Sequence, residues 1–312
     1  MNKPFKYLMV SLGCCALMGR AVPKQSEPAG NLPGNTVSVV VTATGLHGKV
    51  PPGLTGHDVL VYHEREQLPV IDVTPLQKQR AELDLSILLD DSLESTVSQL
   101  AEVADFIRAL PPTTQVAVAY IRNPTFVMGQ DLTTDRELAV KALQVPLGSP
   151  RQFDSPYLAL TDLIEAMPEN GHRRAVLIIS DGEDRFRGPF DPVSPDLEPA
   201  CQEAERRGVL VYTIYATGVG RVQNVVQILD DEGALSQLAH ETGGEAFLKD
   251  SSTPGSLKPY LRELQQILSQ QYLISFQAEP DAAGGYEHFK FTTEFPDVEL
   301  NAPGHVYVPG GK

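Results

Sequence analysis

Two apolar stretches that each end on acidic side chains constrain the fold of this chain most strongly. Residues 83–89 run directly into Asp90-Asp91-Ser92, and residues 175–179 run into Ser180-Asp181-Gly182-Glu183-Asp184. Each stretch has the length and apolar character of a buried strand, and a helical pattern follows the first. In open α/β sheets, ligands bind at the carboxyl ends of the strands. We therefore expect both acidic groups to meet in one site at that edge.

From residue 82 onward, apolar strand patterns alternate with amphipathic helical patterns. Uncharged strands between such helices predict a doubly wound, mostly parallel central sheet with helices on both faces. We interpret the acidic run Asp230-Asp231-Glu232 as the N-terminus of a helix near 234–242, because acidic residues favour that end of a helix. The expected strands cover about 83–89, 115–121, 125–128, 176–180, 209–215 and 246–248, and the expected helices about 93–110, 135–143, 155–167, 197–207, 234–242 and 256–269.

Strand patterns separated only by turns flank this α/β region on both sides. We expect three N-terminal strands near 36–45, 58–62 and 70–73, and three C-terminal strands near 272–276, 289–293 and 306–308. The N-terminal strands alone offer little core. We therefore predict that an N-terminal β segment (36–80) pairs with a C-terminal β segment (271–312) as a small antiparallel unit, with the α/β domain (81–270) inserted between them. Two separate additions to the edges of the central sheet are the alternative.

The first 21 residues read as an export signal. Lys3 and Lys6 precede an apolar stretch, residues 7–18, that is too short to span a bilayer, and cleavage is expected after Ala21. The alternative is a lipid anchor through Cys14 or Cys15. Residues 22–35 are rich in Pro, Gly, Ser and Asn and are expected to form a flexible linker. We predict an exported protein, periplasmic or secreted, with no integral membrane segment after signal cleavage.

Composition narrows the class of partner. The chain carries 25 basic and 40 acidic residues, a formal net charge of −15, and it contains no run of Lys or Arg. Binding to nucleic acid or to an anionic membrane surface is therefore not expected. No G-x-S-x-G motif occurs, and His63-Glu64-Arg65-Glu66-Gln67 lacks the second histidine of a zinc-protease helix. We predict a non-enzymatic protein that binds an unidentified protein partner.

The acid-tipped strands offer oxygen ligands for a hard cation. Asp90, Ser92 and Asp181 provide only carboxylate and hydroxyl oxygens, which Mg²⁺ and Ca²⁺ prefer. Glu94 would add a further carboxylate. Additional hydroxyl or acidic ligands nearby would be Ser155, Asp91 and Asp184. The sequence therefore predicts a metal site at Asp90, Ser92, Glu94 and Asp181, for Mg²⁺ or Ca²⁺.

The order of these motifs resembles a von Willebrand factor type A domain. Residues 90–94 close the first strand of the α/β region, Asp181-Gly182 closes a later one, and residues 238–244 (LAHETGG) resemble a turn found before a short strand in that family. Residues 58–64 (DVLVYHE) and 270–276 (QQYLISF) resemble a narrower group, the exported bacterial VWFA-related domain proteins. The resemblance implies the A-type fold over about residues 82–270.

The resemblance also implies a metal-ion-dependent adhesion site, in which the metal commonly takes a carboxylate from the bound protein. The family pattern maps onto Asp90, Ser92 and Asp181, whereas Glu94 stands at the second serine position and Leu158 at the threonine position. A functional metal site and a metal-free loop cluster both remain open. The expected function is an exported protein-binding or adhesion module with a degenerate site. The alternatives are a metal-independent scaffold subunit of an envelope complex and a metal-dependent hydrolase.

Overall fold

The computed structural model describes most of the chain after the expected leader and linker. The predicted signal peptide (1–21) and linker (22–35), together with Glu94, lie outside the described residues. The described ranges are 36–46, 49–93, 97–145, 153–186, 194–218, 225–248, 255–278 and 284–310.

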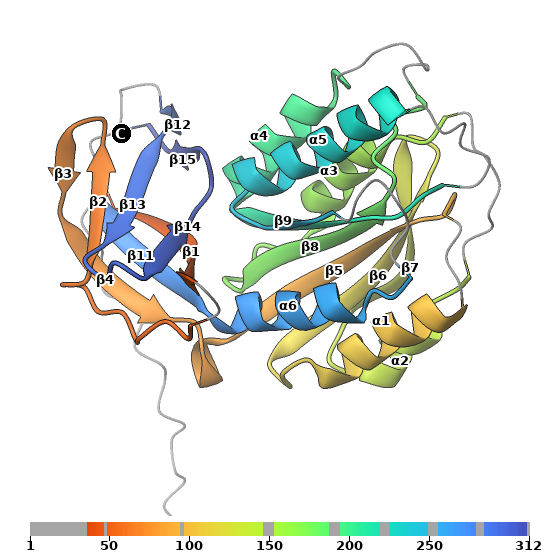
Figure 1. Ribbon diagram of the computed structural model, residues 1–312, viewed down its shortest axis with the longest axis horizontal. Helices are drawn as coiled ribbons and strands as arrows, with labels where there is room; N and C mark the ends of the chain where they lie inside the picture. The colour runs from red at the N-terminus through yellow and green to blue at the C-terminus, as the bar shows by residue number, and fades with distance from the viewer. Residues whose placement is uncertain are drawn as a thin grey trace, which may run out of the picture. The chain divides into compact units, whose positions relative to one another are not determined.

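A six-stranded sheet forms the centre of the α/β domain (Figure 1). Its strand order is β10-β9-β8-β5-β6-β7, and only β7 runs antiparallel to its neighbour. The strands are β5 (Leu83–Asp90), β6 (Thr114–Arg122), β7 (Thr125–Thr133), β8 (Arg173–Ser180), β9 (Val209–Tyr215) and β10 (Ala246–Phe247). Every residue of β5 and β9 is buried, as expected for strands covered on both faces. The predicted doubly wound, mostly parallel sheet is confirmed.

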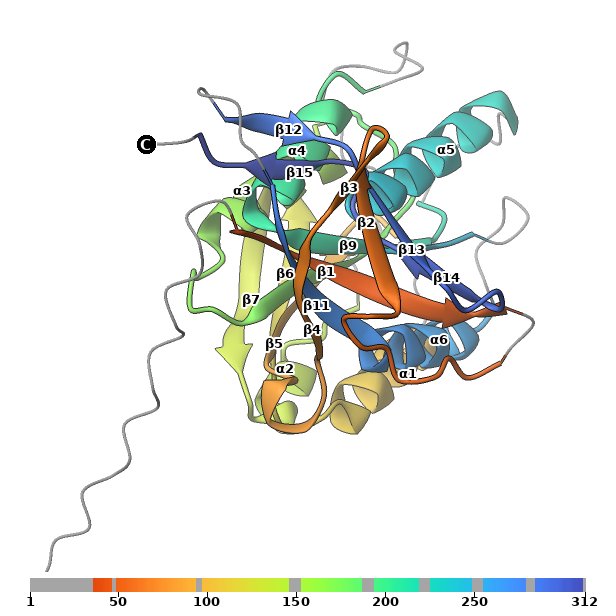
Figure 2. The same cartoon turned by 90° about the vertical axis from the view of Figure 1, so that its left-hand side faces the viewer.

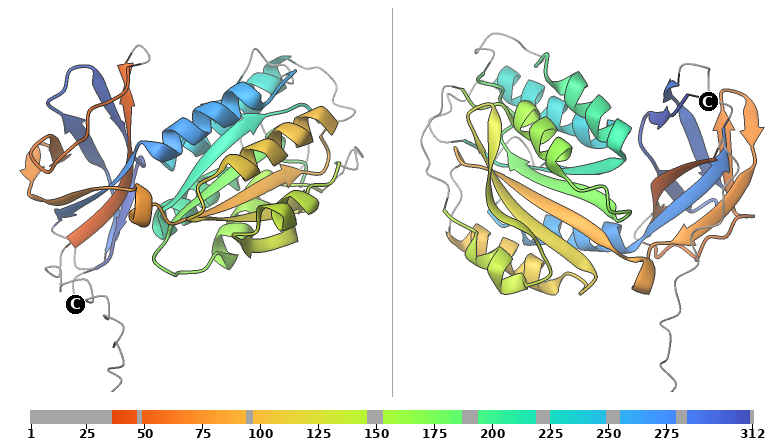
Figure 3. Two further views of the ribbon diagram at one scale, coloured as in Figure 1. Left: turned by 90° about the horizontal axis from the view of Figure 1, so that it is seen from below. Right: turned by 180° about the vertical axis from the view of Figure 1, so that it is seen from behind.

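Helices cover both faces of this sheet (Figures 1 and 3). One core contains residues of α1 (Val97–Ala109), α2 (Arg136–Lys141) and α6 (Lys258–Ser269) packed on the sheet. The core on the other face contains residues of α3 (Pro156–Ala166), α4 (Leu197–Arg207) and α5 (Val225–Glu241). The apolar stripe of each helix thus meets the apolar strands from one side.

The ends of the helices test the sequence rules for caps. Ser155 caps α3, because its hydroxyl accepts a hydrogen bond from the Leu158 amide, and Pro156 occupies the first helical position. The acidic run 230–232 lies inside α5 and not at its N-terminus, so that interpretation was wrong. The helix begins at Val225, nine residues before the expected start near 234, and Ile228 in its first turn already packs into the core with Leu235.

The N- and C-terminal strands form one antiparallel β unit, as predicted (Figure 2). β1 (Thr36–Gly45) pairs along its length with β11 (Gln271–Gln277), so that Thr36 faces Gln277. The four-stranded sheet has the order β14-β1-β11-β4, where β4 is Val70–Pro75 and β14 is Val298–Asn301. A three-stranded sheet has the order β13 (Phe289–Thr293), β2 (Val59–His63), β3 (Glu66–Leu68). A two-stranded sheet pairs β12 (Gly285–Glu287) with β15 (Val306–Val308). Their apolar side chains share one core, which explains how so few N-terminal strands can be stable.

The turn at residues 238–244 joins the end of α5 to β9 and to the chain after β14. The Thr242 hydroxyl donates to the Leu238 carbonyl oxygen and accepts a hydrogen bond from the Val211 amide. A Cβ atom at Gly244 would lie 2.0 Å from the Val211 carbonyl oxygen, so only glycine fits there. The side-chain Nδ2 of Asn301, the last residue of β14, donates to the Gly244 carbonyl oxygen at 2.9 Å. The motif therefore serves packing.

Candidate functional site

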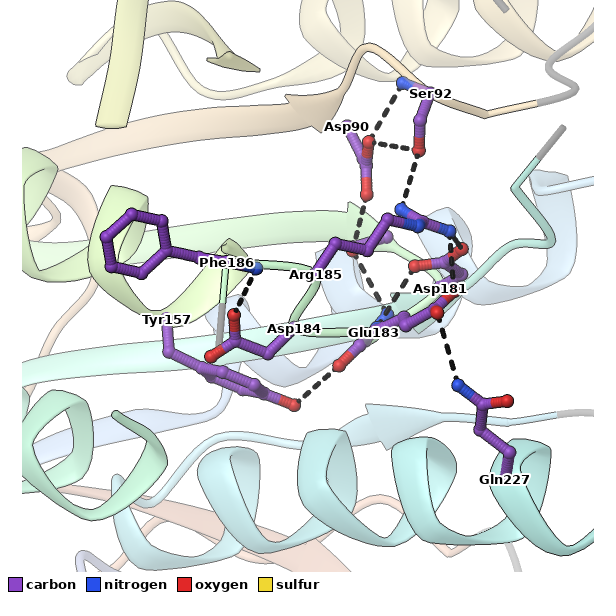
Figure 4. Close-up of polar contacts among 11 residues, drawn as sticks. Asp90, Ser92, Tyr157, Asp181, Glu183, Asp184, Arg185, Phe186 and Gln227 are labelled. Carbon is purple, nitrogen blue, oxygen red and sulfur yellow. Dashed lines mark hydrogen bonds and ion pairs between the residues drawn. The ribbon is translucent and has the colours of Figure 1, made fainter. Parts of the chain in front are cut away.

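The carboxyl ends of β5 and β8 bring the predicted acidic groups together. The two strands are parallel neighbours, with Leu89 opposite Ile179, so Asp90 and Asp181 emerge at the same edge of the sheet. Asp90, Ser92 and Asp181 are all buried. These three residues, predicted from the resemblance, thus form one cluster. Together with Glu183 and Arg185 we call them the strand-end cluster (Figure 4).

The two oxygens of Asp90 are held by neighbouring hydroxyl and amide groups. Oδ1 accepts hydrogen bonds from the Ser92 amide at 2.9 Å and the Ser92 hydroxyl at 2.7 Å. Oδ2 accepts one from the Ser180 hydroxyl at 2.8 Å. Burial, and then the nearby charge of Asp181, raise the pKa of Asp90 to about 6. The hydrogen bonds from Ser92 and Ser180 oppose that rise only partly.

The guanidinium of Arg185 enters this cluster from the loop after β8 (Figure 4). Its Nη2 lies 2.7 Å from Asp181 Oδ2 and 2.7 Å from Glu183 Oε2, and its Nη1 lies 3.4 Å from the Ser92 hydroxyl. The side chain is only 13% exposed. Burial opposes its charge, but the ion pairs with Asp181 and Glu183 outweigh burial and raise the pKa of Arg185. A permanent positive charge therefore joins the ends of β5 and β8.

This arrangement does not fit a bound Mg²⁺ or Ca²⁺ as the side chains stand. Arg185 contacts Ser92 Oγ and Asp181 Oδ2, two oxygens that the resemblance assigns to the metal. A hard cation at that position needs about six oxygen ligands, so it would have to displace the guanidinium. Gly218 packs closely against Asp181 from another side, since a Cβ atom there would lie 2.3 Å from Asp181 Oδ2. Arg185 thus supplies the charge that a metal supplies in the family pattern.

The additional ligands proposed from sequence have other partners. Asp91 Oδ2 accepts a hydrogen bond from Arg122 Nε at 2.8 Å. Asp184 accepts hydrogen bonds from the Phe186 amide and the Ser194 hydroxyl. The Ser155 hydroxyl is the cap of α3. These three residues therefore stabilise the loops and the helix start at this edge through their own hydrogen bonds.

Sequence reasoning missed Arg185, the residue that completes the cluster. Its signal was a basic residue four positions after Asp181, directly after the acidic pair Glu183-Asp184. Glu183 supports it from the same loop, and Gln227 of α5 donates to Glu183 Oε1 at 3.1 Å. Only the path of this loop shows that the arginine turns back toward the sheet.

Apolar side chains are exposed around the strand-end cluster. The Arg185 and Phe186 amides both donate to the Asp154 carbonyl oxygen, which joins the loop after β8 to the chain before α3. The first turn of α5 exposes Val226 and lies beside the cluster, because Gln227 contacts Glu183. The large apolar side chains exposed on the elements next to the cluster, which are the first turn of α1, the chain before α3, the loop after β8 and the start of α5, are Val97, Phe153, Phe186, Val226 and Leu229. We call these five residues the apolar rim. Large apolar side chains that are exposed close together are a feature of protein-binding surfaces.

The strand order, the two acid-tipped central strands and the turn before β10 agree with the resemblance seen in the sequence. The domain has the von Willebrand factor A-type fold. No family model matches the chain, and no curated protein matches it. Its A-type domain therefore shows itself in the fold and in a few short motifs.

Solved structures of similar fold share little sequence with the chain. An aerotolerance-related membrane protein from Bacteroides fragilis is 15% identical, with a TM-score of 0.41, and the match covers 60% of this chain and 98% of that one. The SpRpn10 VWA domain is 14% identical, with a TM-score of 0.38 and coverage of 60% and 96%. The adhesive tip pilin GBS104 from Group B Streptococcus agalactiae is 11% identical, with a TM-score of 0.34 and coverage of 54% and 97%.

Within the described part of the chain, no helix has both the length and the apolar character needed to cross a bilayer.

Proposed function

We propose that the A-type domain is a protein-binding module whose strand-end face docks a protein partner without a bridging metal ion. The observation that carries this proposal is the position of Arg185, which already neutralises Asp181 at the point where the family pattern places the metal. A partner carboxylate would gain no metal bond at this cluster. Burial of the exposed apolar rim then supplies the favourable contribution to binding, about 25 cal/mol per Å² of apolar surface before the entropic cost of association is subtracted.

The apolar rim is suited to such docking because its side chains are large and exposed on the elements next to the strand-end cluster. Phe153 and Phe186 offer aromatic side chains, which are enriched in protein interfaces relative to the rest of the surface. Val226 and Leu229 lie three residues apart on α5 and present one face of that helix. The ion pairs of the strand-end cluster hold the loop after β8 in place.

The test is capture of partners by the immobilised full chain from an envelope extract of the source cells, with and without chelator. We expect capture of the same proteins in excess EDTA and in millimolar Mg²⁺ or Ca²⁺. The double variant Val226→Ala/Leu229→Ala should lose capture. Leu138→Ala is the matched control, because Leu138 is also exposed but lies on α2, after the antiparallel strand β7.

Metal-dependent capture would instead support the adhesion mechanism implied by the resemblance, with Asp90, Ser92 and Asp181 as ligands. Titration calorimetry with Mg²⁺ and Ca²⁺ on wild type and Asp181→Ala separates the two readings directly. Stoichiometric binding to wild type that Asp181→Ala abolishes would overturn the metal-independent proposal. If the immobilised chain captures no protein under any condition, the binding module itself is wrong and a hydrolase returns to consideration.

We propose further that the module acts outside the cytoplasm. Support comes from the sequence alone, through Lys3, Lys6 and the apolar stretch 7–18 before Ala21. The intact mass of the protein recovered from the envelope tests this, since cleavage after Ala21 and lipidation at Cys14 or Cys15 give different masses. Recovery of the uncleaved chain from the cytoplasm would contradict it.

A further inference from the structure

Three potential metal ligands from distant parts of the chain come together outside the strand-end cluster. Glu205 lies in α4, Glu241 is the last residue of α5, and His305 directly precedes β15. One ligand atom from each lies within 4.8 Å of the others. No motif in the sequence connects the three residues, and none of them belongs to the site described above.

Their spacing suits a metal ion better than it suits hydrogen bonds. His305 Nδ1 lies 3.4 Å from Glu205 Oε1 and 3.6 Å from Glu241 Oε2. A ring N–H can donate to only one of these oxygens at a time, and both distances are long for such a bond. Ligands held about 2.0–2.2 Å from a tetrahedral Zn²⁺ lie roughly 3.3–3.6 Å from one another. The two distances from His305 Nδ1 therefore match edges of a zinc tetrahedron, and all three ligand atoms lie within 4.8 Å of one another.

The backbone around the cluster holds these ligands in place. The His305 amide donates to Glu205 Oε1 at 3.1 Å, and the Gly304 amide donates to the Glu241 carbonyl oxygen at 2.7 Å. A Cβ atom at position 304 would lie 2.3 Å from Glu241 Oε2, so glycine is required for that carboxylate to occupy its place. Such second-layer contacts orient metal ligands in known sites.

The charges of the cluster are unbalanced without a cation. The Glu205 side chain is 3% exposed, and among the described residues no lysine or arginine forms an ion pair with Glu205 or Glu241. The neighbouring Arg206 and Arg207 turn instead to Glu203. A divalent cation would balance the two carboxylates and leave His305 neutral, the form that binds metal.

A metal ion can reach the cluster from solvent. The His305 side chain is 48% exposed. A pocket of about 330 Å³ opens beside it and is lined by Glu205, Thr242 and His305 among others. The fourth position of a tetrahedral ion would face this opening and take a water molecule.

We propose that Glu205, Glu241 and His305 form a Zn²⁺ site that fastens the chain before β15 to the ends of α4 and α5. The ligand set of one imidazole and two carboxylates suits zinc and differs from the all-oxygen set at the strand ends. Through His305, the metal would tie the C-terminal β segment to two helices of the A-type domain. The site is independent of the proposed docking face.

The experiment is titration of the metal-free full chain, without a histidine tag, with Zn²⁺ against a competing chromophoric chelator. We expect one tight equivalent for wild type. Replacing a ligand should weaken binding by at least the roughly 10–100-fold seen when second-layer partners are changed, so both His305→Ala and Glu241→Gln should lose the tight equivalent. Co²⁺ bound to wild type should show the intense visible spectrum of a four-coordinate ion, and His305→Ala should not.

Matched controls separate this site from adventitious binding by the chain's seven histidines. His63→Ala removes a histidine that also pairs with a glutamate, Glu287, at 3.1 Å, and should leave the tight equivalent unchanged. Far-ultraviolet circular dichroism establishes that each variant is folded. The proposal is overturned if wild type binds no stoichiometric Zn²⁺, or if folded His305→Ala and Glu241→Gln both bind it as wild type does.

Discussion

Two clusters of acidic side chains in this molecule neutralise their charge in opposite ways. In the strand-end cluster, Arg185 lies 2.7 Å from both Asp181 and Glu183 and is nearly buried. In the cluster of Glu205, Glu241 and His305, the only facing side chain with a basic group among the described residues is a half-exposed histidine. The first cluster carries its own cation, whereas the second is arranged to accept one from solution. An acidic motif alone therefore does not tell whether a site takes a metal.

The largest expected effect comes from removing the internal cation. Arg185→Gln removes the cation that pairs with the buried carboxylate of Asp181 and with Glu183, and breaking a buried pair in this way typically costs about 3–5 kcal/mol in the free energy of unfolding. Urea denaturation measures the loss. Arg108→Gln, which breaks the exposed pair with Glu137, is the control and should change stability little. A loss no larger than that of the control would show that the guanidinium does not neutralise the cluster.

The same variant sharpens the comparison through metal. With Arg185 gone, Ser92 Oγ and Asp181 Oδ2 become available as ligands, so millimolar Ca²⁺ should stabilise Arg185→Gln against urea while leaving wild type unchanged. Equal stabilisation of both proteins by Ca²⁺ would mean that the metal binds elsewhere.

The pH dependence of stability should follow the raised pKa of Asp90. Because the folded-state pKa of about 6 exceeds its ordinary value of 3.8, the folded protein binds the proton more tightly than the unfolded chain. Asp90 therefore contributes stability that is present below about pH 4 and is lost as pH rises toward 6, on the order of 3 kcal/mol in all. Subtracting the profile of Asp90→Asn from that of wild type isolates this term. A flat difference profile would contradict the shift.

Zinc should stabilise the second cluster by mass action. At a free Zn²⁺ concentration of 100 times its Kd, the stability of wild type should increase by about 2.7 kcal/mol, whereas His305→Ala should gain nothing. Without zinc, wild type and His305→Ala should differ little, since the His305 side chain is half exposed. Thermal denaturation with and without Zn²⁺ checks both statements, and an equal gain in the variant would count against the site.

The smallest effect on stability is expected at the apolar rim. Val226→Ala/Leu229→Ala replaces exposed side chains on a helix, so the free energy of unfolding should change by about 0.5 kcal/mol or less. Partner capture should be lost all the same. A large destabilisation would show that these side chains support the fold and that the capture assay does not report on docking.

Much of the fold was predictable because local patterns and the central sheet agree. The largely apolar strands 83–89, in which Asp84 is the one charged residue, and 176–180 indicated burial on both faces, and the observed β5 and β8 are neighbours at the centre of the sheet. The cap at Ser155 could be predicted because capping depends on residues only three positions apart. The start of α5 could not be predicted in this way. The acidic residues 230–232 resemble a helix start, but Ile228, before them in the same helix, already packs into the core.

The sequence by itself determined that Asp90, Ser92 and Asp181 lie at one edge of an A-type sheet, since parallel strands with acidic ends allow no other arrangement. Only the tertiary structure decided what neutralises them. The loop after β8 folds back and places Arg185 among the acids, and no local pattern encodes that path. In the same way, Glu205, Glu241 and His305 are separated by up to 100 residues and meet only because α4, α5 and the chain before β15 converge. Local chemistry fixes where side chains emerge, and long-range packing fixes their partners.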